Sequence, residues 1–89
     1  MYRKKYDIPK KDAQRLHSIK RAAERYGAQL AGHDLAEMVR LIKSGKSRFM
    51  HKLSCTRIQH ALTYQGVDYV VVYDRKRKTI CSCLPPDAE

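Results

Sequence analysis

Hydrophobic positions in the first part of the chain recur every three or four residues, a spacing typical of an amphipathic helix. The first stripe begins near Lys11 and consists of Leu16, Ile19, Ala23 and Tyr26. Gly27 follows directly, and glycine is well suited to ending a helix. The pattern therefore predicts a helix over about residues 11–26, with these four side chains buried.

A second helical stripe follows a short link. It runs from about His33 to Ser44 and consists of Leu35, Met38, Val39 and Ile42. Two acids, Asp34 and Glu37, come early and two bases, Arg40 and Lys43, come late, which is the order that the helix dipole favours. Gly45 then ends the predicted helix.

After this glycine the hydrophobic pattern changes to an alternation of period two, which indicates strands. Four strands are predicted, over residues 48–53, 56–64, 67–73 and 79–84. Gln65-Gly66 is a tight hairpin signal between the second and the third, and Pro85-Pro86 ends the last.

These elements predict one α+β domain over residues 1–89. A basic arm (1–9) precedes two helices (10–45), which pack on one face of a three- to four-stranded antiparallel sheet (46–86). The other face of the sheet is then free to bind a ligand. A chain of 89 residues leaves no room for a second domain.

Charge narrows the class of ligand. Nineteen Lys and Arg stand against nine Asp and Glu, a net charge of +10. Residues 40–57 contain no acid, and the segment 75–78 is four basic residues in a row. Such a field predicts a polyanionic partner, RNA first, with DNA or an acidic protein as alternatives.

Cysteine usage and hydropathy predict a cytoplasmic protein without a membrane segment. Three cysteines do not form a disulfide framework, so reduced thiols are expected. No apolar run approaches the roughly 20 residues that span a bilayer, and no secretory signal is present. Cys81-x-Cys83 alone is a weak zinc signal, and CxxC and HxxxH spacings are absent. We therefore expect neither a metal nor another cofactor.

RNA can be cleaved without a metal when its own 2′-hydroxyl attacks the adjacent phosphate. The protein then supplies a base, an acid and cations around the phosphate, roles that suit imidazole and guanidinium. Arg57 and His60 are the favoured catalytic pair, and His51 and Ser82 complete the predicted catalytic set. Arg57 and His60 are three apart, so a regular strand would place them on opposite faces, and a bulge would be needed to bring them together. The alternative for His60 is a hydrogen-bonded core histidine. His17 is predicted to be exposed and without a role.

Further residues are predicted to bind RNA through phosphate contacts, hydroxyl hydrogen bonds or base stacking. They are Lys46, Arg48, Lys52, Ser54, Tyr64 and Tyr73. Solvated charge is the alternative for the bases, and strand packing is the alternative for the tyrosines. Regular alternation would place His51 on one face with Phe49 and Leu53, and Lys52 on the other with Arg48 and Met50.

The segment from about residue 29 to 86 resembles a known group of proteins. A helix ending in LIKSGK, followed by HKLSCTRIQHALTYQGVDYVVVYDRKRKTICSCLPP, is similar to the small α+β ribonucleases that include barnase, anticodon-cleaving colicins and RelE-type toxins. Ser82 stands where many of these proteins have threonine in the last strand. The resemblance implies cleavage or binding of RNA, often tRNA or ribosome-bound mRNA.

The sequence thus leads to two functional hypotheses. The first is a small metal-independent endoribonuclease, a toxin or an effector of the kind found in phages and mobile elements, with tRNA or mRNA as substrate. The second is a basic protein without catalytic activity that binds and inhibits a nucleic acid or an acidic host protein. An antidote protein is a further possible partner.

Overall fold

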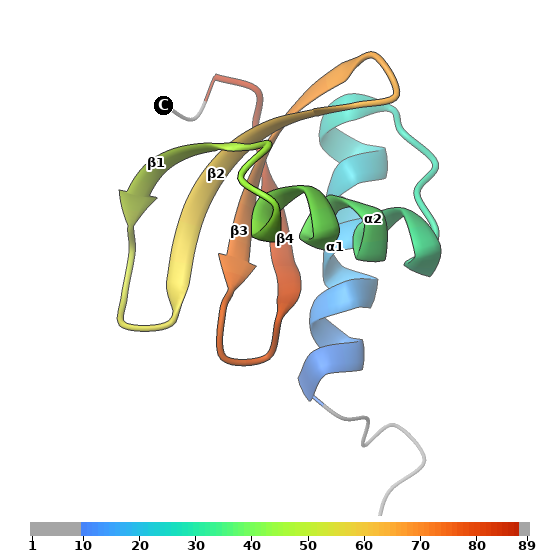
Figure 1. Cartoon of the computed structure of the whole chain (residues 1–89). Coiled ribbons are helices and arrows are strands. Elements are labelled where there is room, and N and C mark those ends of the chain that lie inside the picture. The colour runs from blue at the N-terminus through green and yellow to red at the C-terminus, as the bar shows by residue number, and fades with distance from the viewer. Residues whose placement is uncertain (1–9, 88–89) are drawn as a thin grey trace, which may run out of the picture.

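The computed structural model describes residues 10–87 and has the predicted α+β fold, two helices packed against a four-stranded antiparallel sheet (Figure 1). The elements in chain order are α1 (Lys10–Tyr26), α2 (Gly32–Lys43), β1 (Arg48–Lys52), β2 (Arg57–Tyr64), β3 (Val67–Asp74) and β4 (Thr79–Leu84). The sheet order is β1-β2-β3-β4, so each strand pairs with its neighbour in the chain. The predicted basic arm, 1–9, lies outside the described residues.

Local backbone signals explain why these boundaries match the sequence pattern so closely. Gln65 and Gly66 both have positive φ, 50° and 78°, as the tight turn of a two-residue hairpin requires. Gly45, with φ of 80°, ends α2 in a conformation that other residues adopt only at a cost. The sequence therefore predicted both the hairpin turn between β2 and β3 and the end of α2.

The two faces of the sheet differ. We call the face that carries Ile58, His60, Leu62 and Tyr64 of β2 the helix-covered face, and the face that carries Arg57, Gln59, Ala61 and Thr63 the open face. The core lies between the helix-covered face and the helices and includes Leu35, Met38, Leu62, Val71 and Ile80, each at most 4% exposed. Full burial of one such side chain is worth roughly 1.5–3 kcal/mol, so this layer holds the fold together.

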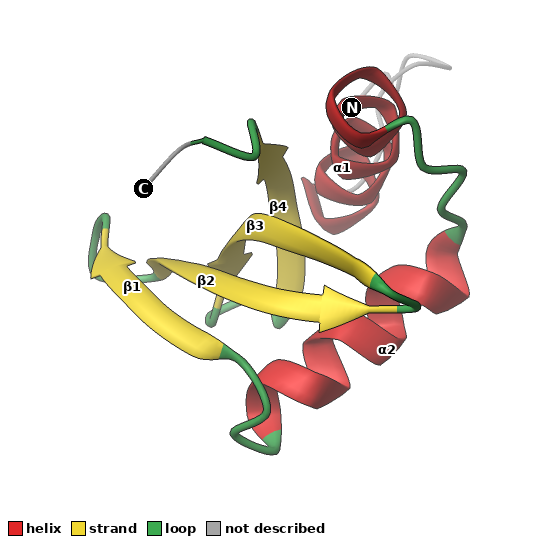
Figure 2. Cartoon of the chain, turned by 90° about the horizontal axis from the view of Figure 1, so that it is seen from above, coloured by secondary structure: helices red, strands yellow, loops and turns green. Residues whose placement is uncertain are grey.

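Helix α1 is rotated relative to its predicted orientation. Leu16 is 59% exposed and Ala23 is also exposed, whereas Gln14, Ser18 and Ala22 are buried, so the predicted stripe is wrong at two of its four positions. The reason is that α1 packs along β4, the edge strand of the sheet, instead of lying flat on the core (Figure 2).

An edge strand presents carbonyl groups that need partners, and polar side chains of α1 supply them. Ser18 Oγ lies 2.8 Å from the carbonyl oxygen of Ile80, and Arg25 donates to the carbonyl of Cys83 at 2.8 Å. The hydroxyl of Tyr26 donates to the carbonyl of Leu84. The buried stripe of α1 is therefore small and polar because it seals a strand edge.

A bulge in β1 changes the predicted faces of that strand. The partners across β1 and β2 are Arg48 with Ala61, Phe49 with His60, His51 with Gln59, and Lys52 with Ile58. The register shifts between Phe49 and His51, so these two residues lie on opposite faces, contrary to the regular alternation we expected. Lys52 likewise lies on the helix-covered face and Arg48 on the open face.

Neither described helix combines the length and the apolar character that a membrane-crossing helix needs.

Candidate functional site

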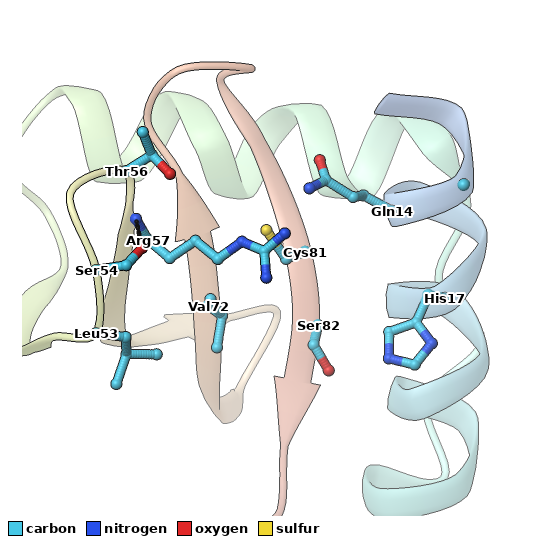
Figure 3. Close-up of a pocket in the computed structure, with 10 residues that line it drawn as sticks. Gln14, His17, Leu53, Ser54, Thr56, Arg57, Val72, Cys81 and Ser82 are labelled. Carbon is cyan, nitrogen blue, oxygen red and sulfur yellow. Dashed lines mark hydrogen bonds between the residues drawn. The ribbon is translucent and has the colours of Figure 1, made fainter. Parts of the chain in front are cut away.

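The open face is hollowed beside α1 into a cleft of about 730 Å³, which we call the Arg57 cleft (Figure 3). Its lining comes from α1, from the β1–β2 turn and from β2, β3 and β4. The lining residues are Ala13, Gln14, His17, Leu53, Ser54, Thr56, Arg57, Val72, Cys81 and Ser82. This volume is in the usual range for small-molecule sites.

The β1–β2 turn fixes the base of Arg57. The backbone N–H groups of Leu53 and Ser54 both donate to the carbonyl of Arg57, at 2.8 and 3.1 Å. The N–H of Arg57 in turn donates to Ser54 Oγ at 3.2 Å. The side chain extends from β2 across Val72 toward β4 (Figure 3). A locally closed turn therefore directs this guanidinium into the cleft.

Arg57 differs from other arginines of the protein in its surroundings. Arg40 and Arg77 pair with Glu37 and Asp74 at 2.6 and 3.1 Å. Among residues 10–87, no Asp or Glu forms a salt bridge with Arg57, and no carboxylate is among the lining residues of the cleft. The exposed guanidinium is therefore available to an anion from outside.

Ser82 and His17 stand on the opposite wall from the Arg57 turn. Ser82 is half-buried on β4 opposite Val72, and a bulge next to it brings Cys81 to the cleft as well. His17 of α1 is exposed, and its ring lies beside Ser82 (Figure 3). A cation, a hydroxyl and an imidazole thus line one open hollow, a combination that suits a phosphate ester.

His17 is exposed, as predicted, and it lies at the cleft because α1 turns a different face toward β4 than the one we expected. It was not among the predicted site residues. The signal that could have identified it is the polar stripe: Gln14, Ser18 and Ala22 recur at every fourth residue, and His17 borders that stripe. A helix that buries glutamine and serine faces something other than a hydrophobic core.

His60 does not reach the cleft. Residues 57–64 of β2 pair with β3 in one unbroken register, so no bulge brings His60 to the face of Arg57. Its Nδ1 lies 2.9 Å from Ser47 Oγ, and its half-buried ring meets Phe49 and Tyr73 edge-on. Burial lowers the pKa of His60 below its ordinary value of 6.5. The structure therefore favours the alternative of a hydrogen-bonded core histidine.

The other predicted bases are spread over the sheet. His51 is exposed on the open face but is not among the lining residues of the cleft, and Lys52 is exposed on the helix-covered face. Lys46 and Arg48 line a second hollow, of about 680 Å³, which also includes Asp68. The structure thus brings only Arg57, Ser82 and Ser54 of the predicted site residues into the Arg57 cleft.

The two tyrosines predicted to bind RNA both have contacts within the fold, which agrees with the alternative of strand packing. Tyr73 is 6% exposed within the core. The hydroxyl of Tyr64 donates to Asp34 Oδ1 at 2.6 Å, and this hydrogen bond raises the pKa of Tyr64 to about 12. Asp34 Oδ2 accepts from the N–H of Ala31, so the contact ties β2 to the start of α2. Neither tyrosine is among the lining residues of the cleft.

Within the described part of the chain, no group of three or more His, Cys, Asp or Glu side chains is arranged to hold a metal ion. The three cysteines are free thiols. Burial raises the pKa of Cys83 to about 11, so this thiol is a packing group.

Comparisons of the chain with family models, with curated proteins and with solved structures gave no match. The chemistry of the Arg57 cleft is therefore the basis for assigning a function.

Proposed function

We propose that the protein binds RNA in the Arg57 cleft and cleaves it without a metal, as a small cytoplasmic endoribonuclease. The observation that carries the proposal is the meeting of Arg57, which has no acidic partner among the described residues, with His17 and Ser82 in one open hollow. The net charge of +10 supports a polyanion as the ligand.

Arg57 holds the phosphate. A guanidinium donates two parallel hydrogen bonds to phosphate oxygens, and it stabilises the extra negative charge that develops on them in the transition state. The hydroxyls of Ser54, Thr56 and Ser82 are further donors around the same hollow. Arg75 stands at the margin of this region, because its backbone N–H donates to the carbonyl of Thr56 at 2.8 Å.

His17 transfers a proton. In the proposed reaction the 2′-oxygen forms a bond to phosphorus while the bond to the 5′-oxygen breaks, leaving a 2′,3′-cyclic phosphate and a free 5′-hydroxyl. The attacking hydroxyl loses a proton and the leaving oxygen gains one. His17 is the imidazole among the cleft residues and serves one of these transfers, while water serves the other.

The presence of a single imidazole in the cleft lining favours one alternative, binding of RNA without cleavage. Acid–base catalysis by one positioned group is worth roughly 10²- to 10⁴-fold in rate. A cleft with Arg57 but without effective proton transfer would hold RNA and leave it intact. The protein would then inhibit the RNA by binding it without cleaving it.

Cleavage of RNA in EDTA tests the proposal. The purified protein should release fragments that end in a cyclic phosphate, and His17→Ala should slow cleavage by about 10²-fold or more while RNA binding persists. His33→Ala is the matched control, since the side chain of His33 is 81% exposed at the start of α2. Intact RNA with strong binding would select the alternative. If His33→Ala slows cleavage as much as His17→Ala, the cleft is the wrong site.

A further inference from the structure

One exposed hydrophobic side chain lies in the lining of the Arg57 cleft. Leu53, at the start of the β1–β2 turn, is 51% exposed and is one of the lining residues. The other large hydrophobic residues that are exposed in the described part of the chain are Leu16, Phe49 and Val67, and none of them lines the cleft. Single exposed hydrophobic side chains are common on protein surfaces. The position of Leu53, more than its exposure, therefore suggests a ligand.

The backbone of the turn fixes Leu53 relative to Arg57. The N–H of Leu53 donates to the carbonyl oxygen of Arg57 at 2.8 Å, and the N–H of Ser54 donates to the same oxygen at 3.1 Å. Val72 of β3, across which the Arg57 side chain extends, is a second aliphatic residue of the lining (Figure 3). Val72 is only 7% exposed. The accessible apolar surface on the strand side of the cleft therefore belongs mainly to Leu53.

The cleft thus combines a cation with an aliphatic surface, and one turn holds the two together. The Arg57 guanidinium can bind a phosphate through two parallel hydrogen bonds. The Leu53 side chain cannot form a hydrogen bond and gains only when an apolar surface covers it. A nucleotide carries both partners, a phosphate and, joined to it through the ribose, a flat base with a π-face. No Phe or Tyr is among the described lining residues, so an aliphatic side chain is the surface that the cleft offers to a base.

We propose that Leu53 packs against a nucleobase of the RNA whose phosphate Arg57 binds, so that the cleft has a base subsite beside its phosphate subsite. This inference rests on the proposed function, in which the cleft holds a phosphodiester. Sequence is read through hydrogen bonds to the edges of the bases, and an aliphatic side chain makes none. Leu53 therefore contributes affinity and orients the nucleotide without selecting one base, and it takes no part in proton transfer.

Binding of two single-stranded oligonucleotides of equal length tests the inference: RNA, and abasic RNA, which keeps the ribose and phosphate groups but lacks the bases. A His17→Ala background prevents cleavage during the measurement. Leu53→Ala should weaken binding of RNA by about three- to tenfold, the effect of losing a half-exposed leucine as a contact. It should leave binding of abasic RNA unchanged. Leu53→Met keeps the apolar volume and should retain the affinity for RNA. Leu16→Ala is the matched control and should change neither affinity, because Leu16 is 59% exposed but lies outside the cleft lining.

The outcomes separate this inference from the proposed function. Equal losses of affinity for RNA and abasic RNA in Leu53→Ala would overturn the base contact, because the substitution would then act by displacing Arg57. Unchanged binding of RNA by Leu53→Ala would overturn it as well and leave the phosphate site standing. If Arg57→Ala weakens binding of neither oligonucleotide, the proposed function itself fails.

Discussion

The two faces of the sheet use the same strands but differ in the surroundings of some of their polar side chains. On the helix-covered face, His60 is paired with Ser47 and Tyr64 with Asp34. These two side chains of the covered face are therefore paired within the protein. On the open face, the Arg57 guanidinium has no acidic partner among the described residues. The open face pairs Thr63 with Asp68 and Asp74 with Arg77 in the same way, so Arg57 is an exception on that face. This exception is the reason for proposing a ligand at the Arg57 cleft.

Asp74 is the acid that most strongly connects the open face to the rest of the fold, so its loss should have the largest effect on stability. It is fully buried and accepts hydrogen bonds from Gln14, Lys76 and Arg77. Asp74→Ala would leave these donors unpaired, and we expect a loss of about 3 kcal/mol in the free energy of unfolding. Urea denaturation measures it. A loss below about 1 kcal/mol would mean that this network contributes little.

A smaller effect on stability is expected from two substitutions in α1, and comparing them tests which side of this helix faces the sheet. Ser18 is fully buried and its hydroxyl contacts the carbonyl of Ile80, whereas Leu16 is 59% exposed. Ser18→Ala should therefore lower the free energy of unfolding by about 1 kcal/mol, and Leu16→Ala should change it by less than about 0.5 kcal/mol. Thermal or urea unfolding of the two variants gives the comparison. A larger loss of stability for Leu16→Ala than for Ser18→Ala would show that Leu16 is buried, as the hydrophobic pattern predicted.

The smallest expected effect is a pH dependence of the free energy of unfolding, caused by His60 on the helix-covered face. Burial lowers the pKa of His60, so below the ordinary value of 6.5 the unfolded chain binds a proton that the folded protein resists. Stability should therefore be complete above that pH and should fall as the pH decreases through it. His60→Gln should flatten this part of the curve of unfolding free energy against pH. An unchanged slope would show that His60 titrates as freely in the folded protein as in the unfolded chain.

The elements of the fold could be predicted because their signals are local. Alternating hydrophobicity marks β2, and a continuous run of hydrophobic residues marks β3. Gly45 and Gln65-Gly66 lie where the backbone takes positive φ. The orientation of α1 could not be predicted by the same means, because its buried stripe of Gln14, Ser18 and Ala22 carries almost no hydrophobic signal. Burial of such residues depends on a strand edge that is distant in sequence.

The candidate site was predictable only in part, for the same reason. Arg57, Ser54 and Ser82 could be proposed from residue type and position in strands, and the structure places all three around one cleft. The position of His17 in the cleft lining could not, since it depends on the rotation of α1. The bulge in β1, which moves Phe49 and His51 to opposite faces, also leaves no mark in the alternation of residues. Long-range packing decides each of these points.

The most direct test of the central claim compares two arginines of equal charge. Arg57 lies in the cleft, whereas Arg40 lies on α2 and pairs with Glu37. If the open face binds a phosphate at Arg57, Arg57→Ala should weaken binding of single-stranded RNA by about tenfold or more. It should also reduce the slope of log affinity against log salt by about 0.7, the loss of one phosphate contact. Arg40→Ala should change both much less. Equal effects of the two substitutions would contradict the claim, because binding would then depend on overall charge and not on the cleft.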